Sequence, residues 1–228
     1  MANSSYHIEF DIDLRRNPYK GRYIVIEGID GSGKTTQVQL IREALESQGK
    51  KVIETAEPNT HDAIGVLIRE VLAGKETISP VAIQYLFSAN RATTHQKIII
   101  PALERGDYVV SHRCFWSAVA YGMVDRAEEV RENAGNQILI AQSILSMYHQ
   151  FIVPDSTYYL QVSVDTAMQR LESSGKELET LYEKREKLEK IVGGYDWLLK
   201  KFPDEFRVID AERSVEQITE SILASISA

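Results

Sequence analysis

The stretch that most constrains the fold is GIDGSGKT, Gly28–Thr35. It matches the pattern G-x-x-x-x-G-K-[S/T], follows the apolar run Tyr23–Ile26 and precedes a segment with helical spacing of apolar residues. Glycines let a backbone curl so that successive N–H groups face a phosphate, and the N-terminus of the following helix adds to that attraction. The motif therefore predicts a phosphate-binding loop between a buried parallel strand and a helix.

Each residue type in this loop has its own expected role. The Lys34 ammonium is expected to bridge the β- and γ-phosphates of a nucleoside triphosphate and to act in catalysis, while the Thr35 hydroxyl is expected to bind Mg²⁺. The predicted ATP-binding set is Gly28, Gly31, Ser32, Gly33, Lys34, Thr35 and Thr36. The motif indicates a nucleoside triphosphate but does not say which reaction follows.

Strand-like and helix-like segments alternate along the rest of the chain. Further strands are predicted at KVIETAEP, DYVVS, STYYLQVS and FRVID. Helices are predicted from Lys34 to a stop at Gly49, over residues 64–73, and from Ser79, where a serine N-cap precedes proline at the first helical position. This alternation predicts an α/β protein with the P-loop NTPase fold, a five-stranded parallel sheet flanked by helices.

The chain is predicted to form a single domain over residues 21–228, preceded by a leader at residues 1–20. HIEFDIDL in the leader alternates apolar and polar residues, so the leader is either an extra edge strand or an unanchored tail. The Glu- and Lys-rich run at residues 175–201 is interpreted as a solvated helix face. A polar segment at about residues 173–180 is expected to form a short mobile lid.

Composition excludes several classes of partner. The formal net charge of -7 argues against a general nucleic-acid binder, and no apolar run approaches the roughly 18 residues that span a bilayer. The single cysteine, Cys114, excludes an intramolecular disulfide and a thiol-rich metal cluster. These features favour a cytoplasmic protein that acts on metabolites rather than on nucleic acid or membranes.

Several further motifs occur in a fixed order, and together with the phosphate loop they resemble the thymidylate kinases from Tyr23 to the C-terminus. They are AEPNTHDAIGVLIRE, YLFSANRATTHQKIIIPALERGDYVVSHR, WSAVAYG, VPDSTYYLQVSVDTAMQRL and VIDAERSVEQITESI. The resemblance implies phosphoryl transfer from Mg-ATP to dTMP, giving dTDP and ADP, in a homodimer.

The resemblance also implies how the phosphate and sugar of the acceptor nucleotide are held. Arg69 and Arg113 resemble the arginines that grip the monophosphate, a task suited to a rigid guanidinium fork, and Arg113 is also assigned to catalysis. Asp30 looks like the acidic residue that accepts a hydrogen bond from the 3′-hydroxyl, whereas read alone it is also typical of a turn. Glu57 is assigned to substrate binding and, with Thr35, to the metal.

The base is expected to lie against two helices. Phe87 and Arg91 share a helix face, which resembles a stacking ring beside a donor for a thymine carbonyl. Ser117 and Tyr121 resemble a base-edge contact and an aromatic wall against a ribose 2′-hydroxyl. Without the resemblance, Phe87 reads as a core residue, and Ser117 with Tyr121 reads as one face of an ordinary amphipathic helix.

The strand end SHRC departs from the family pattern. His112-Arg113-Cys114 stands where the family usually has Asp-Arg-Tyr. A neutral imidazole offers one acceptor and an imidazolium repels a cation, so the metal must be handled differently, with Glu57 and Asp30 as leading substitutes and Glu27 as a weaker one. His112 is alternatively a buried structural histidine, and residues alone do not rank the two readings.

The second departure concerns the cation that stabilises the transferring phosphoryl group. Some thymidylate kinases carry an arginine in the phosphate loop, where this chain has Gly31, so the lid is expected to supply the cation. Lys176 is the lid residue assigned to catalysis, flanked by Arg170, Lys184 and Arg185. Slow turnover is therefore expected.

Two alternatives remain open from these departures. One is a kinase for another nucleoside monophosphate, because His112 and Cys114 alter the acceptor pocket. The other is a nucleotide-binding protein with weakened or lost catalysis.

Overall fold

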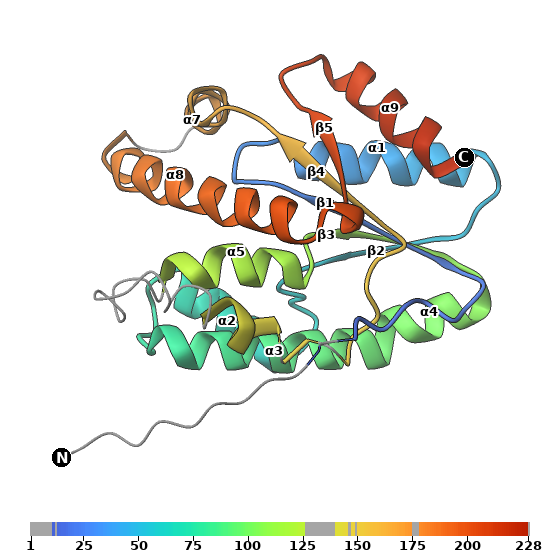
Figure 1. Ribbon diagram of the computed structural model, residues 1–228, viewed down its shortest axis with the longest axis horizontal. Helices are drawn as coiled ribbons and strands as arrows, with labels where there is room; N and C mark the ends of the chain where they lie inside the picture. The colour runs from blue at the N-terminus through green and yellow to red at the C-terminus, as the bar shows by residue number, and fades with distance from the viewer. Residues whose placement is uncertain are drawn as a thin grey trace.

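A central sheet organises the chain in a computed structural model that describes residues 11, 13–125, 140–145, 147–148, 150–174 and 178–227. Its strands are β1 (Arg22–Glu27), β2 (Val52–Ala56), β3 (Tyr108–His112), β4 (Ser156–Gln161) and β5 (Phe206–Asp210). All pairings are parallel, and the spatial order is β2-β3-β1-β4-β5. The predicted five-stranded parallel sheet is confirmed (Figure 1).

The register of the central strands aligns the ends of β1, β3 and β4. Ile26 of β1 lies beside His112 of β3 on one side and beside Tyr158 of β4 on the other. The segments that follow β1 and β3 therefore leave the sheet at the same edge, the carboxyl ends of the strands. Open α/β sheets bind ligands at this edge, where the strand order reverses.

Helices cover both faces of the sheet. The helix that follows the phosphate loop, α1 (Lys34–Ser47), packs against α9 (Val215–Ser227) and against the central strands. In Figure 1 these two helices lie together above the sheet, while α3 (Pro80–Thr94) and α5 (Phe115–Asp125) lie below it. The predicted helix start at Lys34 and stop near Gly49 are confirmed, since Gly49 has a φ of 76° directly after the helix.

Two helix N-termini between β2 and β3 are fixed by side-chain caps. Asp62 accepts a hydrogen bond from the Gly65 amide at 2.8 Å and starts α2 (Ala63–Leu72), and Ser79 accepts one from the Ala82 amide at 3.2 Å and starts α3. The predicted Ser79 cap with proline at the first helical position is confirmed. The chain continues from α3 through a π-helical turn, η1 (His95–Ile99), into α4 (Ile100–Arg105).

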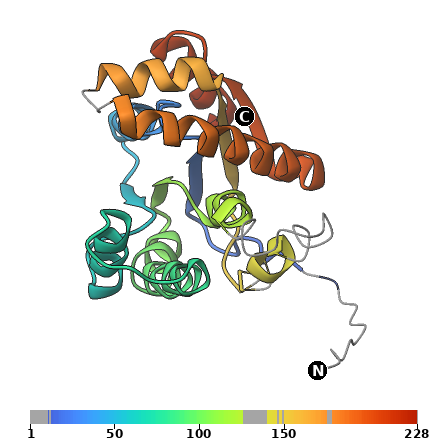
Figure 2. The same cartoon turned by 90° about the vertical axis from the view of Figure 1, so that its left-hand side faces the viewer.

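The charged C-terminal run forms a long helix. After α7 (Val164–Ser173), α8 (Leu178–Lys201) leads into the short 3₁₀ turn η2 (Pro203–Glu205), and Figure 2 shows α7 and α8 side by side. The charged positions of α8 that the structure describes face solvent, but Leu188, Ile191, Tyr195 and Leu198 form a buried stripe that packs on α5. The solvated face predicted from sequence is therefore one side of α8, and the other side is part of the core.

The described part of the leader is attached to the body. Arg15 forms an isolated parallel bridge with Ile152, Arg16 pairs with the Glu205 carboxylate, and the Asn17 side chain donates to Asp155 at 2.8 Å. Most of the alternating apolar residues predicted as an edge strand lie outside the described residues, so that prediction stands untested. No helix in the described ranges is both long enough and apolar enough to cross a bilayer.

Candidate functional site

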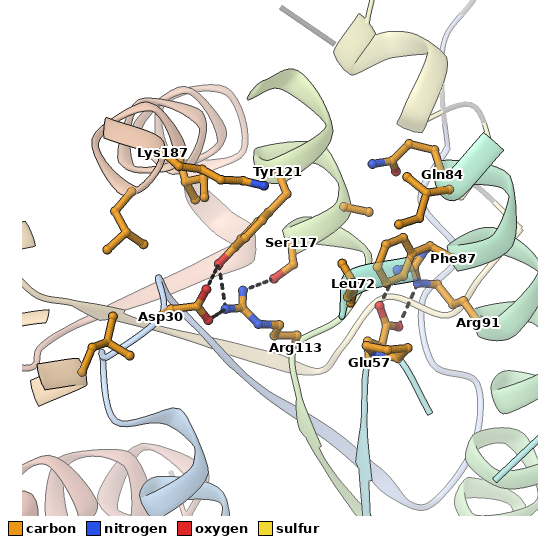
Figure 3. Close-up of a pocket in the computed structure, with 16 residues that line it drawn as sticks. Asp30, Glu57, Leu72, Gln84, Phe87, Arg91, Arg113, Ser117, Tyr121 and Lys187 are labelled. Carbon is orange, nitrogen blue, oxygen red and sulfur yellow. Dashed lines mark hydrogen bonds and ion pairs between the residues drawn. The ribbon is translucent and has the colours of Figure 1, made fainter. Parts of the chain in front are cut away.

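A cavity of about 380 Å³ opens at the carboxyl ends of the strands. Its walls come from the phosphate loop, the segment after β2, and helices α2, α3, α5, α7 and α8. Figure 3 shows polar groups gathered at two ends, with Asp30, Arg113, Ser117 and Tyr121 on one side and Glu57 and Arg91, beside the Phe87 ring, on the other. A cavity of this volume suits a small ligand such as a nucleotide.

Arg113 is the hub of the first end. Arg113 Nη2 donates to the Asp30 carboxylate and to the Tyr121 hydroxyl, both at 2.8 Å. Arg113 Nη1 donates to Ser117 Oγ at 2.9 Å. The guanidinium also lies 4.8 Å from the centre of the Tyr121 ring. The structure therefore brings together four of the residues predicted to bind the acceptor, Asp30, Arg113, Ser117 and Tyr121.

The backbone of Arg113 holds this geometry. Its φ of 72° lies in the left-handed region, which is uncommon for a non-glycine residue. The amide of Arg113 donates to the Ile26 carbonyl at 3.0 Å, and its carbonyl accepts from Ser111 Oγ at 2.7 Å. These bonds lock the turn after β3 and aim the guanidinium at the phosphate loop, as expected where strain is stored at a functional site.

Glu27, at the end of β1, is a buried anchor beneath this end of the cavity. Its carboxylate accepts hydrogen bonds from the Cys114 amide at 2.9 Å, from Ser117 Oγ at 2.6 Å and from the Tyr195 hydroxyl at 2.7 Å. These donors fully occupy it, which argues against its use as a substitute metal carboxylate. Tyr195 was missed from sequence, although its spacing with Leu188 and Ile191 marks the buried face of α8.

Glu57 and Arg91 form the other end. Arg91 Nε donates to one Glu57 oxygen at 2.8 Å and Nη2 contacts the other, so the pair is bidentate, and the guanidinium lies 4.3 Å from the centre of the Tyr148 ring. Both Glu57 oxygens are engaged, which favours a role in orienting Arg91 over a role as a metal ligand. Phe87, one turn before Arg91, lines the cavity as expected of a stacking ring and is only partly buried.

The phosphate loop has the form that the motif predicts. Lys34 is buried and its Nζ donates to the Ile29 carbonyl at 2.7 Å, while Thr35 and Thr36 are exposed at the start of α1. Burial and the nearby charge of Arg113 lower the pKa of Lys34 to about 7. An incoming anionic phosphate would favour the charged form again.

Gly31 packs against α7. Its φ is 84°, and a Cβ atom at this position would lie 2.4 Å from the Ala167 carbonyl oxygen. The loop therefore has no room for a side chain at the position where an arginine was considered from sequence. An arginine at position 31 would therefore clash with α7 in this fold.

His112 is a partly buried neighbour of the cations rather than a titrating group at neutral pH. Burial and the positive charges of Lys34 and Arg113 lower the pKa of His112 to about 3, so its imidazole is neutral. Cys114 is completely buried, and burial raises the pKa of its thiol well above its usual value. Neither side chain lines the cavity.

Not every predicted residue joins the cavity. Arg69 is exposed on α2 and does not line it, and Lys176 lies outside the described residues, as does the side chain of Lys184. Arg170 donates to the Ala211 carbonyl at 2.8 Å, and Arg185 pairs with Asp165. The lid prediction is untested for the same reason as Lys176.

The cation that the structure does bring to the cavity from α8 is Lys187, which sequence analysis missed. It is exposed and lines the cavity close to Tyr121 (Figure 3). Gln84, one turn before Phe87 on α3, was missed as well and lines the cavity from a buried position. The only sequence signal for these two residues is their spacing relative to neighbours that were recognised.

The donor set bears on whether a divalent cation fits. Within the described ranges, no group of three or more His, Cys, Asp and Glu side chains is arranged to hold a metal ion. Mg²⁺ in phosphoryl-transfer enzymes is usually held by one or two protein groups together with substrate phosphates, so a dedicated protein cage is not required. The exposed Thr35 hydroxyl at the helix N-terminus fits that arrangement.

Comparisons with known proteins show the family of this chain. The family model described as thymidylate kinase matches residues 26–222. A probable thymidylate kinase of Thermococcus gammatolerans is 35% identical over 215 residues, covering 90% of this chain and 96% of the relative. A thymidylate kinase of Bifidobacterium longum subsp. infantis is 35% identical with coverage of 90% and 86%, and one of Exiguobacterium sp. is 31% identical with coverage of 89% and 92%.

Proposed function

Because the chain belongs to the thymidylate kinase family, we propose that it transfers the terminal phosphoryl group of ATP to dTMP, giving dTDP and ADP. The observation that carries this proposal is the 2.8 Å ion pair between Asp30 of the phosphate loop and Arg113 of the cavity. It couples the donor-binding loop directly to the acceptor-binding cavity, which is the proximity that phosphoryl transfer between two nucleotides requires.

The side chains divide the work between positioning and charge. The acceptor phosphate is itself the nucleophile, so no general base is needed, and catalysis rests on alignment and electrostatic stabilisation. Arg113 is held ready to bind the acceptor phosphate, with Asp30 and Tyr121 as its present partners. Lys34 exchanges its contact with the Ile29 carbonyl for phosphate oxygens when the donor binds.

We propose Thr35 as the protein ligand of Mg²⁺ carried by ATP. Bound there, the ion would neutralise charge on the donor phosphates during transfer. We assign Glu57 to orienting Arg91 toward the base rather than to binding Mg²⁺, because both of its oxygens already contact the Arg91 guanidinium.

The alternative acceptors are less well supported. The curated relatives quoted above are thymidylate kinases or probable thymidylate kinases, and the cavity retains Phe87 and Arg91 for a base with a carbonyl at its edge. His112 does not line the cavity, so its departure from the family pattern does not reshape the acceptor pocket directly. The assay below distinguishes a kinase from a protein that binds nucleotides without catalysis.

A homodimer and a cytoplasmic location complete the proposal. Exposed apolar side chains lie on α2 and α3, where Val66 is 48% and Tyr85 is 63% exposed, and this surface is proposed to pair with a second copy. Light scattering on the purified protein tests the pairing. The buried, reduced Cys114 fits a reducing compartment.

The decisive experiment is a coupled assay of nucleoside diphosphate formation from Mg-ATP with dTMP, dUMP, dCMP or AMP. The proposal expects kcat/KM to be highest for dTMP. A higher kcat/KM for another monophosphate would identify that nucleotide, instead of dTMP, as the acceptor. Tight dTMP binding in calorimetry with no turnover would leave a nucleotide-binding protein.

A further inference from the structure

The Gln84 side chain carries a buried carbonyl oxygen, Oε1, with no hydrogen-bond partner, in a cavity whose other polar groups largely bond one another. Among the residues that the structure describes, two that line the cavity carry a buried polar atom without a partner, Arg91 through Nη1 and Gln84 through Oε1. Gln84 is 4% exposed, so water does not satisfy its amide freely. Buried polar groups normally have partners, and an exception inside a cavity points to a ligand.

The position of the Gln84 amide is constrained from across the cavity. A Cβ atom at Gly122 of α5 would lie 3.0 Å from Gln84 Nε2, so the bare glycine allows the amide to approach that helix. Figure 3 shows the amide extending from α3 toward α5. Gln84 and Arg91 lie about two helical turns apart on one face of α3, with Phe87 between them.

Ser117, which the sequence predicts to contact the base edge, already forms hydrogen bonds with other protein groups. The Ser117 hydroxyl donates to Glu27 at 2.6 Å and accepts from Arg113 at 2.9 Å, and its amide also donates to Glu27. The Tyr121 hydroxyl likewise accepts a hydrogen bond from Arg113 and donates one to Asp30. Contacts with the base edge then fall to the two side chains of α3 that each keep an unpaired polar atom, Gln84 and Arg91.

We propose that Gln84 is a specificity residue whose side-chain carbonyl accepts the N3–H of a pyrimidine base with a 4-oxo group. This inference rests on the proposed acceptor, dTMP. Such a base presents an imide edge, a donor N3–H flanked by two carbonyls, and a carboxamide is its complement in both donor and acceptor. Arg91 Nη1 supplies a donor for a neighbouring carbonyl, while Phe87 stacks on the ring.

The test uses dTMP and its N3-methyl derivative, which lacks the N3 proton and carries a methyl group where the amide is expected. Calorimetry on the wild-type chain should give binding of N3-methyl-dTMP about 100-fold weaker than that of dTMP, from a lost hydrogen bond plus overpacking. Gln84→Met, which keeps the volume, should weaken dTMP about tenfold. Gln84→Ala should bind N3-methyl-dTMP more tightly than the wild-type chain does.

The Gln84→Ala result is a gain of binding, so misfolding cannot imitate it. Gln39→Met on the exposed face of α1 repeats the chemical change outside the cavity and should bind both ligands as the wild type does. Equal wild-type affinity for the two ligands would overturn the proposal, as would an unchanged ratio in both Gln84 variants. Wild-type turnover of dTMP is measured in parallel, so a failure of the kinase activity is seen separately from a failure of base recognition.

Discussion

Arg113 and Asp30 face each other at 2.8 Å, although they arrive from different strands of the sheet. Arg113 is 10% exposed and Asp30 is 57% exposed, so the ion pair lies at the boundary between the buried network and the open phosphate loop. A guanidinium at such a boundary can exchange a carboxylate for a phosphate without leaving its buried supports. We therefore propose that Arg113 can exchange Asp30 for a phosphate while it keeps its contact with Ser117.

Replacing Arg113 with lysine should reduce kcat/KM for dTMP by about 100-fold, because a single ammonium cannot keep the fork of contacts to Ser117, Asp30 and Tyr121. Steady-state kinetics measures the loss. Arg207→Lys on β5 makes the same change away from the cavity and should retain wild-type kinetics. Equal losses in both variants would show that the effect is a general one on stability.

Removing the Glu57 charge should destabilise the fold. Glu57→Gln leaves the buried Arg91 guanidinium without its counter-charge, and such losses are about 3 kcal/mol. Urea unfolding measures the change. Glu54→Gln on the preceding strand β2, whose ion pair with Arg42 is exposed, should stay within about 0.5 kcal/mol. The double variant Glu57→Gln, Arg91→Met should recover part of the stability while losing dTMP affinity. A Glu57→Gln protein as stable as the wild type would contradict this reading.

His112→Asp should increase kcat. An aspartate at this position would lie near Lys34 and Arg113, whose charges lower the pKa of His112, and it would place a carboxylate near the proposed Mg²⁺ site. The expected gain is about 10- to 100-fold at limiting Mg²⁺. His112→Asn is the neutral control and should give no gain. If the aspartate variant equals the asparagine one, other groups already handle the metal.

Stability should fall as the pH drops below about 6.5, partly through His95. Burial lowers the pKa of this imidazole, which packs against Phe151 at 4.9 Å between ring centres. The native state therefore binds fewer protons than the unfolded state, whose histidine titrates near 6.5, so the stabilising contribution is full above that pH and is lost as the pH falls toward the folded pKa. The contribution of His95 alone to this slope is at most about 1.4 kcal/mol per pH unit.

Urea unfolding between pH 8 and pH 5 measures this slope for the wild type and for His95→Phe, which should flatten it. His61→Gln at an exposed histidine serves as the matched comparison and should leave the slope unchanged. An unchanged slope in His95→Phe would assign the pH dependence to other groups.

Placing an arginine in the phosphate loop should fail to accelerate the reaction. Gly31→Arg combines a left-handed φ with a Cβ atom 2.4 Å from the Ala167 carbonyl, so α7 must move. A lowered melting temperature and no rise in kcat are expected. Gly49→Ala has a similar φ of 76° with no atom near its Cβ, and it should lose only the roughly 1 to 2 kcal/mol of the backbone strain. Equal losses at the two glycines would argue against the contact with α7.

The sequence was most informative where signals are local. The apolar run before Gly28, the glycine pattern and the Ser79-Pro80 pair each act within a few residues, and the loop, the strands and the capped helix appear where they were predicted. Residues in ordered motifs, such as Asp30 and Arg113, were also identified, because their neighbours in the chain mark them.

Hydrogen-bond partners that come from distant parts of the chain could not be predicted from the sequence. Tyr195 lies in a charged run, yet it reaches Glu27 across the interface of α8 with α5. Glu57 was assigned to the metal because a carboxylate was missing elsewhere, whereas in the fold both of its oxygens contact Arg91. Ser117 was assigned to the base, but its hydroxyl bonds Glu27 and Arg113.

The sequence by itself determined the class of fold, the phosphate loop and the family, because strand and helix periodicity and the glycine motif depend on neighbouring residues. Only the tertiary structure decided which polar groups remain available in the cavity. Hydrogen-bond partners come from strands and helices far apart in the chain, so whether Ser117, Glu57 or Gln84 can meet a ligand depends on which donors and acceptors the fold has already paired.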